Sequence, residues 1–146
     1  MNCIIYLVRS SEKDVEEFNK SLGLLEENLL KYTTADVLVF VEESFEKYKP
    51  KVETNLELLY QTIEFNLPDY PSEILDNIPE FYPHPTHGNG PVEWGHPGFT
   101  MGYRHMCRMF SGEFYKFPIV QQYEYYIRLD TDSFIQTPLG LSLIHI

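Results

Sequence analysis

The first 41 residues place an amphipathic segment between two continuous apolar runs. Residues 3–8 (Cys-Ile-Ile-Tyr-Leu-Val) and 36–41 (Asp-Val-Leu-Val-Phe-Val) are short and rich in β-branched side chains, which is typical of buried parallel strands. Between them, Ser11 and Asp14 form a capping-box-like helix start. The apolar positions that follow at helical spacing are Val15, Phe18, Leu22, Leu25 and Leu29. This order of strand, helix and strand predicts a β-α-β unit with a parallel sheet and a right-handed crossover.

The middle of the chain has a less regular pattern. Residues 54–65 place Leu56, Leu59, Tyr60 and Ile63 on one side of a helix, so we expect a helix there. Residues 66–97 contain most of the ten prolines, together with several glycines, and predict a long irregular excursion. Such a segment inside a compact domain is more often functional than incidental.

Helical periodicity returns over residues 99–116. The polar side of this predicted helix carries Arg104, His105, Arg108 and Ser111, and Pro118 ends it. The opposite side is an apolar stripe that we expect in the core, formed by Phe99, Tyr103, Met106, Phe110, Phe114 and, beyond the helix, Phe117. Residues 125–129 (Tyr-Tyr-Ile-Arg-Leu) then form a further apolar, aromatic-rich strand.

Two carboxylates, Asp130 and Asp132, follow this last strand, one residue apart. Alternation along a continued strand would point both side chains to the same side. Acidic side chains that converge at the carboxyl end of a buried strand offer oxygen ligands to a hard divalent cation. The alternative is a polar turn that closes the strand, because Asp, Thr and Ser also favour turns.

The charge of the chain narrows the range of ligands. The formal net charge of −11 argues against general binding of nucleic acid, which needs clustered Lys and Arg. The four arginines, Arg9, Arg104, Arg108 and Arg128, follow the first strand or precede the acidic pair. Guanidinium groups pair bidentately with phosphate, so this placement favours a small anionic ligand. Solvated surface arginines are the alternative.

Other candidate sites are weak. Cys3 and Cys107 show no spacing for zinc or a redox pair, and we expect buried free thiols. His84, His87 and His96 lie in the proline-rich excursion, where Pro85 disfavours presentation of two histidines from one helix turn, so we expect no histidine metal site. No apolar run reaches the length of a membrane-spanning helix.

Three segments together resemble a known family. They are residues 103–108 (Tyr-Arg-His-Met-Cys-Arg), residues 110–115 (Phe-Ser-Gly-Glu-Phe-Tyr), and residues 125–128 (Tyr-Tyr-Ile-Arg) running into the acidic pair. In this order they closely resemble the fungal-type Golgi α-1,2-mannosyltransferases, glycosyltransferase family 15. Residues 7–10 (Leu-Val-Arg-Ser) and the following helix resemble the opening β-α unit of the same family. The resemblance covers both ends of the chain and is weakest over residues 47–98.

The resemblance implies an α/β GT-A fold of the nucleotide-sugar-binding, Rossmann-like type with a mostly parallel sheet. It further implies a GDP-mannose donor, Mn²⁺ as the metal with Mg²⁺ as the alternative, and transfer to a mannosylated glycan or glycoprotein with retention of configuration. The residues that it assigns to nucleotide-sugar binding are Arg9, Tyr103, Arg104, Ser111 and Asp130, and those at the metal are Asp130 and Asp132. The family has Glu-Pro-Asp where this chain has Asp130-Thr131-Asp132, which preserves the charge pattern but weakens the inference of donor sugar and acceptor.

We interpret residues 1–138 as the N-terminal part of the catalytic domain and residues 139–146 as a non-native or truncated tail. In the family, the catalytic acid and a further metal ligand lie downstream of this motif, so we expect the 146-residue chain alone to be inactive. The family also implies a location on the lumenal side of the Golgi membrane.

Two other functions fit parts of the pattern. A nucleotide-sugar-binding module without catalysis would keep the same metal and nucleotide residues. A phosphotransferase of the haloacid-dehalogenase kind also places Asp-x-Asp after an apolar strand, with the first Asp as nucleophile. That family expects Thr or Val where this chain has Phe134, and it carries the motif early in the chain.

Overall fold

The computed structural model describes residues 2–65, 71, 73, 81–82 and 99–139. The chain divides into two compact units, the first formed by Met1–Glu64 with Gln122–Ile146 and the second by Phe65–Gln121. Most of the predicted excursion at 66–97, its three histidines, and residues 140–146 lie outside the described residues.

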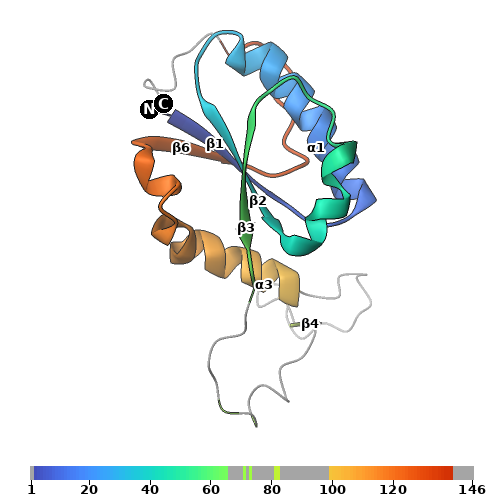
Figure 1. Cartoon of the computed structure of the whole chain (residues 1–146), viewed down its shortest axis with the longest axis vertical. Helices are drawn as coiled ribbons and strands as arrows, with labels where there is room; N and C mark the ends of the chain where they lie inside the picture. The colour runs from blue at the N-terminus through green and yellow to red at the C-terminus, as the bar shows by residue number, and fades with distance from the viewer. Residues whose placement is uncertain (1, 66–70, 72, 74–80, 83–98, 140–146) are drawn as a thin grey trace. The chain divides into compact units, whose positions relative to one another are not determined.

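The first unit is built on a parallel sheet of four strands in the order β3-β2-β1-β6 (Figure 1). These strands are β1 (Asn2–Val8), β2 (Asp36–Glu42), β3 (Leu58–Ile63) and β6 (Tyr125–Leu129). β1 pairs in parallel with both β2 and β6, which confirms the predicted β-α-β unit and the predicted last strand. Residues of β1 and β2 are buried on both sides of the sheet, as their continuous apolar sequences indicate.

Helix α1 (Glu12–Leu25) continues into the π-helical turn η1 (Glu26–Leu30) and covers one face of the sheet (Figure 1). Ser11 caps the helix, since its backbone is extended and its side chain accepts a hydrogen bond from the Asp14 N–H. The predicted apolar stripe is buried and packs on the sheet. This core combines residues of β1, α1–η1 and β2, namely Ile4, Tyr6, Val8, Val15, Phe18, Leu22, Leu25, Leu29, Val37, Val39 and Val41, with Phe45.

The helix predicted over residues 54–65 is wrong, because Leu58–Ile63 forms strand β3. β3 pairs in parallel with β2 from Val37↔Leu58 to Glu42↔Ile63. Leu58 and Tyr60, two residues apart, both pack against the core. Their spacing of two residues is that of a strand. The short apolar segment fits either the helical or the strand period, and pairing with the backbone of β2 favours the strand.

Short helical turns and one hydrogen bond complete the first unit. The 3-10 turns η2 (Glu43–Lys47) and η3 (Lys49–Lys51) follow β2, and η7 (Val120–Gln122) precedes β6 at the boundary with the second unit. The Tyr123 hydroxyl donates to Asp36 Oδ2 at 2.6 Å, which joins the approach to β6 to the start of β2.

The second unit contains a helical segment and a two-stranded antiparallel pair. β4 (Phe81–Tyr82) pairs with β5 (Phe99–Thr100), and α3 (Met101–Arg108) continues into η5 (Met109–Glu113) and η6 (Phe114–Lys116). The helix predicted over residues 99–116 is therefore confirmed over Met101–Arg108, whereas the turns that follow to Lys116 are π and 3-10 helical and are interrupted at Gly112. The predicted core stripe is only partly correct, because Phe114 is buried while Tyr103 is exposed, and Met109, outside that stripe, is buried.

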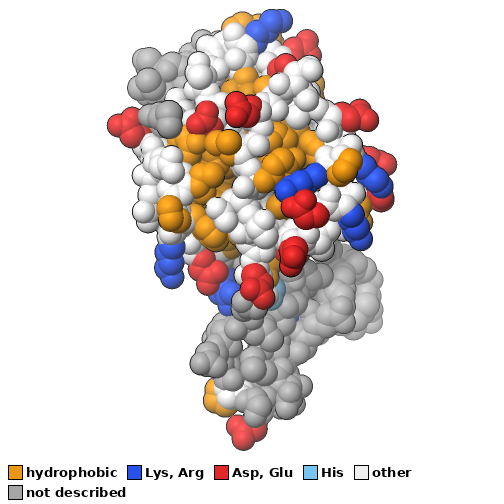
Figure 2. Space-filling model, in the orientation of Figure 1, with side chains coloured by type: hydrophobic (Ala, Val, Ile, Leu, Met, Phe, Trp, Pro, Cys, Tyr) orange, Lys and Arg blue, Asp and Glu red, His pale blue; other side chains and the backbone are white. Residues whose placement is uncertain are grey.

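Charged side chains of both signs are interspersed over the visible face of the described residues, with apolar side chains between them (Figure 2). The large apolar residues that remain exposed are mostly tyrosines, whose hydroxyls can face water. Cys3 is buried as expected, but Cys107 is exposed, contrary to expectation. Within the described ranges, no helix is long and apolar enough to cross a membrane.

Candidate functional site at the carboxyl ends of β1 and β6

The carboxyl ends of β1 and β6 lie side by side. The two strands pair in parallel up to Tyr6↔Leu129, so Arg9, which follows β1, and Asp130, which follows β6, lie at the same edge of the sheet. The chain extends from β1 through β2 and β3 on one side, and β6 joins on the other side. This is the topological switch point of the sheet, where parallel α/β folds bind their ligands.

The acidic pair lies in a turn and not in a continued strand. The Ser133 N–H donates to the Asp130 carbonyl at 2.9 Å, and the Asp130 N–H donates to Ser133 Oγ at 3.0 Å. We call residues 130–133 the acidic turn. The alternation argument for Asp130 and Asp132 is therefore wrong, since β6 ends at Leu129. The strand ends there because the backbone of Asp130 forms hydrogen bonds with the side chain and backbone of Ser133 in place of hydrogen bonds with a neighbouring strand.

Both carboxylates of the acidic turn reach solvent. The Asp130 side chain is 60% exposed and accepts a hydrogen bond from Arg128 Nη2 at 2.7 Å. Asp132 is also exposed, whereas Thr131 between them is buried. The turn is thus anchored through its middle residue and presents its two acids outward. The structure combines the two interpretations of the sequence, since a turn that closes a strand can also present ligands.

The donor set of the acidic turn fits a hard divalent cation that is shared with a ligand. Carboxylate oxygens suit Mn²⁺ or Mg²⁺, which also accept phosphate oxygens and water. No cluster of three or more His, Cys, Asp or Glu side chains suited to a metal occurs among the residues that the structure describes. Asp130 and Asp132 would therefore leave coordination positions open for the oxygens of a diphosphate.

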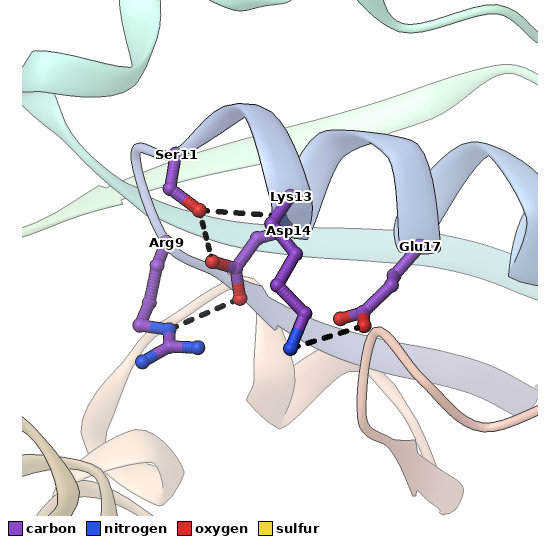
Figure 3. Close-up of polar contacts among 5 residues, drawn as sticks. All are labelled: Arg9, Ser11, Lys13, Asp14 and Glu17. Carbon is purple, nitrogen blue, oxygen red and sulfur yellow. Dashed lines mark hydrogen bonds and ion pairs between the residues drawn. The ribbon is translucent and has the colours of Figure 1, made fainter.

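Arg9 is held in place by a buried carboxylate that the sequence analysis did not assign to the site. Arg9 Nε donates to Asp14 Oδ1 at 3.0 Å, and Ser11 donates to the other oxygen of Asp14 (Figure 3). The Arg9 side chain is 75% exposed and that of Asp14 only 7%. The terminal nitrogens of Arg9 lie on the side away from Asp14 (Figure 3). Asp14 thus fixes the guanidinium while its outer edge faces solvent, where it can meet an anion.

The remaining predicted residues belong to the second unit. Tyr103 on α3 is exposed and Arg104 is half-buried. The Ser111 hydroxyl donates to the Cys107 carbonyl at 2.7 Å, one helical turn back, and Arg108 Nε lies 3.0 Å from Glu113 Oε1. The assignment of Tyr103, Arg104 and Ser111 to the nucleotide-sugar site stays a prediction.

Further residues that the sequence analysis missed support the acidic turn from the core. The Ser21 hydroxyl on α1 donates to the Ser133 carbonyl at 2.6 Å. Asn28 Nδ2 donates to the Ile135 carbonyl at 2.6 Å, and the backbone carbonyl of Asn28 accepts from the Leu139 N–H at 2.8 Å. The signal in the sequence was a set of polar residues next to the apolar stripe of α1.

Comparison with known proteins agrees with this architecture. A parallel α/β sheet with an acidic turn at its switch point is an arrangement suited to nucleotide-sugar binding. The family model for glycolipid 2-alpha-mannosyltransferases matches residues 1–141, and the chain belongs to this family of glycosyltransferases. The family resemblance stated from the sequence is thereby confirmed.

The curated relatives are yeast proteins that are longer than this chain. The probable mannosyltransferase KTR5 of Saccharomyces cerevisiae is 30% identical over 136 residues, which cover 88% of this chain and 24% of KTR5. The O-glycoside alpha-1,2-mannosyltransferase omh1 of Schizosaccharomyces pombe is 64% identical over 28 residues, or 19% of this chain and 7% of omh1. The chain therefore spans about a quarter of the length of KTR5.

Solved structures confirm the fold class. The mannosyltransferase Ktr4p of S. cerevisiae superposes with a TM-score of 0.60 at 24% identity, over 90% of this chain and 32% of that protein. Core-mannan synthase A of Aspergillus fumigatus, solved in an Mn/GDP form, gives a TM-score of 0.59 at 23% identity, over 90% of this chain and 34% of that protein. At this identity the likeness establishes the shared fold.

Proposed function

We propose that the protein is a retaining α-1,2-mannosyltransferase that transfers mannose from GDP-mannose to a mannose-containing glycan on protein. The observation that carries the proposal is the juxtaposition of Arg9 with the acidic turn at the switch point, in a chain of this family. The names of its relatives support mannose transfer and the α-1,2 linkage, and the Mn/GDP form of core-mannan synthase A supports the nucleotide and the metal. We further propose the lumenal side of the Golgi membrane as its location.

In this proposal Asp130 and Asp132 hold Mn²⁺, which supplies Lewis-acid stabilisation of the departing GDP. Arg9, fixed by Asp14, offsets negative charge on the diphosphate from the neighbouring strand end. Arg128, which pairs with Asp130 in the structure, would be available to pair with a phosphate oxygen if Asp130 bound the metal. The family resemblance also assigns Tyr103, Arg104 and Ser111 to nucleotide-sugar binding.

The test is calorimetric titration of GDP into the protein, with and without Mn²⁺. Asp132→Asn removes a charge without changing volume, so the fold should remain while Mn²⁺-dependent GDP affinity falls about tenfold or more, or by at least about 1.4 kcal/mol. Asp130→Asn should act in the same direction but less strongly. The matched control is Glu16→Gln, which removes an equally exposed acid from α1 and should leave GDP binding unchanged.

Transfer itself is measured with GDP-mannose and an α-mannoside acceptor, on the protein produced from the complete gene. Formation of an α-1,2-linked disaccharide that depends on Mn²⁺ is the expected result. Mn²⁺-dependent GDP binding without transfer would favour the binding module. Unchanged Mn²⁺-dependent affinity in Asp132→Asn would leave the acidic turn with a structural role only.

A further inference from the structure

Helix α1 and its continuation η1 carry an unusual line of buried polar side chains. Asp14, Ser21 and Asn28 are seven residues apart, so each lies two helical turns from the next on the same face. They are three of the four buried polar or charged residues in the described part of the chain. We call these three residues the polar stripe. A buried polar group destabilises a fold unless it is hydrogen-bonded, so the partners of this stripe indicate its role.

Each member of the polar stripe contacts a segment that leaves the carboxyl end of β1 or β6. Asp14 binds Arg9, directly after β1. Ser21 binds the carbonyl of Ser133, the last residue of the acidic turn. The Asn28 side chain donates to the Ile135 carbonyl in the segment that follows the turn, and the Asn28 backbone carbonyl accepts from the Leu139 N–H. One rigid helix therefore fixes both strand ends that form the candidate site.

The central contact is a relay of directed hydrogen bonds. Ser21 has one hydroxyl hydrogen and donates it to the Ser133 carbonyl, so the Tyr6 hydroxyl, 2.8 Å from Ser21 Oγ, must be the donor to Ser21. Tyr6 is fully buried in β1 and packs edge-on against Phe18 of α1, with ring centroids 5.0 Å apart. The relay thus ties the acidic turn to the buried core between β1 and α1.

Ser133 transmits this anchoring to the acids. Its carbonyl binds Ser21, while its N–H and its hydroxyl bind the backbone carbonyl and N–H of Asp130. A second contact reinforces the position, since Lys20 Nζ lies 4.3 Å from the ring centroid of Phe134. The orientation of the acidic turn is therefore set by α1 and not only by its own hydrogen bonds.

We propose that Ser21, supported by the rest of the polar stripe, is a positioning residue that holds the acidic turn in the geometry needed to bind its divalent cation. The inference rests on the proposed function. Ser21 is buried and acts through Ser133. Apolar residues could also pack against the sheet. The polar stripe differs in that its hydrogen bonds hold Arg9 and the acidic turn to the same helix, which fixes their relative positions.

The key variant is the double substitution Tyr6→Phe with Ser21→Ala. Ser21→Ala alone leaves the Tyr6 hydroxyl buried without its acceptor, which destabilises the fold. The double variant removes that hydroxyl as well, so stability is largely restored while the Ser133 carbonyl loses its anchor. The matched control is Tyr6→Phe, which loses the first hydrogen bond of the relay but keeps the one from Ser21 to Ser133.

Two measurements are made on each variant. Amide hydrogen exchange at Ser133 and Asp130, without metal, reports on the turn itself and should accelerate about tenfold in the double variant, the effect of losing one hydrogen bond. Titration of Mn²⁺ with GDP present should show affinity about three- to tenfold weaker in the double variant. Tyr6→Phe should have the exchange rates and the Mn²⁺ affinity of the native chain, after the exchange rates are corrected for its change in global stability.

The outcomes separate the inference from the proposed function. Native exchange rates and native Mn²⁺ affinity in the double variant would overturn the positioning role of Ser21. Equal effects in Tyr6→Phe and in the double variant would overturn it too, because general loss of stability would then explain both. Absence of Mn²⁺ binding in the native chain, with faster turn exchange in the double variant, would overturn the proposed metal site while leaving the relay as an anchor of the turn.

Discussion

Arg128 and Asp130 form an ion pair across the last residue of β6, with 2.7 Å between Arg128 Nη2 and Asp130 Oδ1. The Arg128 side chain is two-thirds buried, whereas Asp130 is mostly exposed. One of the two carboxylates of the proposed metal site is thus neutralised by a cation from its own strand. A metal must displace this guanidinium, and a diphosphate that arrives with the metal offers it a replacement partner.

Arg128→Gln should therefore strengthen the binding of Mn²⁺ alone, by about two- to fivefold, which is the range of a partly exposed ion pair. The change removes both a competitor for Asp130 and a repelling charge. The measurement is titration of Mn²⁺ in the absence of nucleotide, followed by electron paramagnetic resonance of the free ion. Lys31→Gln, which removes an exposed charge from the end of η1, should change nothing. Weaker Mn²⁺ binding in Arg128→Gln would contradict this competition.

Arg9 and Lys13 provide a matched pair for testing the nucleotide side of the site. Their side chains are 75% and 78% exposed, and each pairs with an acid of α1, Asp14 and Glu17 respectively (Figure 3). Only Arg9 lies at the strand end next to the acidic turn. Arg9→Gln should weaken GDP binding in the presence of Mn²⁺ by about three- to tenfold, through loss of a charge-assisted hydrogen bond to phosphate.

Lys13→Gln should leave GDP affinity unchanged, because an exposed charge that contacts no ligand is screened by salt. Both variants are titrated at two salt concentrations. Equal losses in the two variants would indicate that only the general charge of this surface matters, and the assignment of Arg9 to the nucleotide would be withdrawn.

The two cysteines should differ in reactivity. Cys3 is fully buried, and burial together with the nearby Asp36 carboxylate raises the pKa of its thiol to about 11. Cys107 on α3 is exposed. A disulfide reagent at pH 8 should therefore modify one thiol in the native chain and both after denaturation, because the thiolate is the reactive form. In Cys107→Ala, the fast reaction should disappear; two fast reactions in the native chain would show that β1 opens readily.

Sequence patterns predicted the elements of this fold wherever the apolar periodicity allowed one interpretation. The runs that became β1 and β2 are continuous and rich in β-branched residues, and α1 with its continuation η1 has an unbroken apolar stripe from Val15 to Leu29. β3 was missed because the segment from Leu58 to Ile63 is so short that it fits both the helical and the strand period. Only its pairing with β2 identifies it as a strand.

The residues of the candidate site likewise divide into those that the sequence indicates and those that only the fold reveals. Arg9, Asp130 and Asp132 could be proposed from the sequence because their residue types and positions after strands carry the signal. Ser21 was missed because its partner, Ser133, is 112 residues away along the chain, and only the fold brings them together. A polar residue beside the apolar stripe of a helix is ordinary in a sequence, and it becomes informative once its buried partner is known.

Tyr6 gives the fold a specific weakness at alkaline pH. Burial raises the pKa of the Tyr6 phenol to about 12. The neutral phenol is thus favoured in the folded chain relative to the unfolded chain, where the pKa is about 10. This contribution to stability is fully present below about pH 10 and is lost as the pH rises toward 12, by at most about 3 kcal/mol.

The measurement is the free energy of unfolding by urea at several pH values between 8 and 12. The native chain should lose more stability over this range than Tyr6→Phe, which has no phenol to ionise at this position. Tyr125→Phe serves as the control, because it removes an exposed phenol from β6 of the same sheet and should keep the native slope. Cys3→Ala should delay the onset of the loss, since the raised pKa of the Cys3 thiol makes its contribution decline first, from about pH 9. Identical slopes in the native chain and Tyr6→Phe would mean that the alkaline transition arises elsewhere, because the buried phenolate of Tyr6 could then not be what destabilises the sheet.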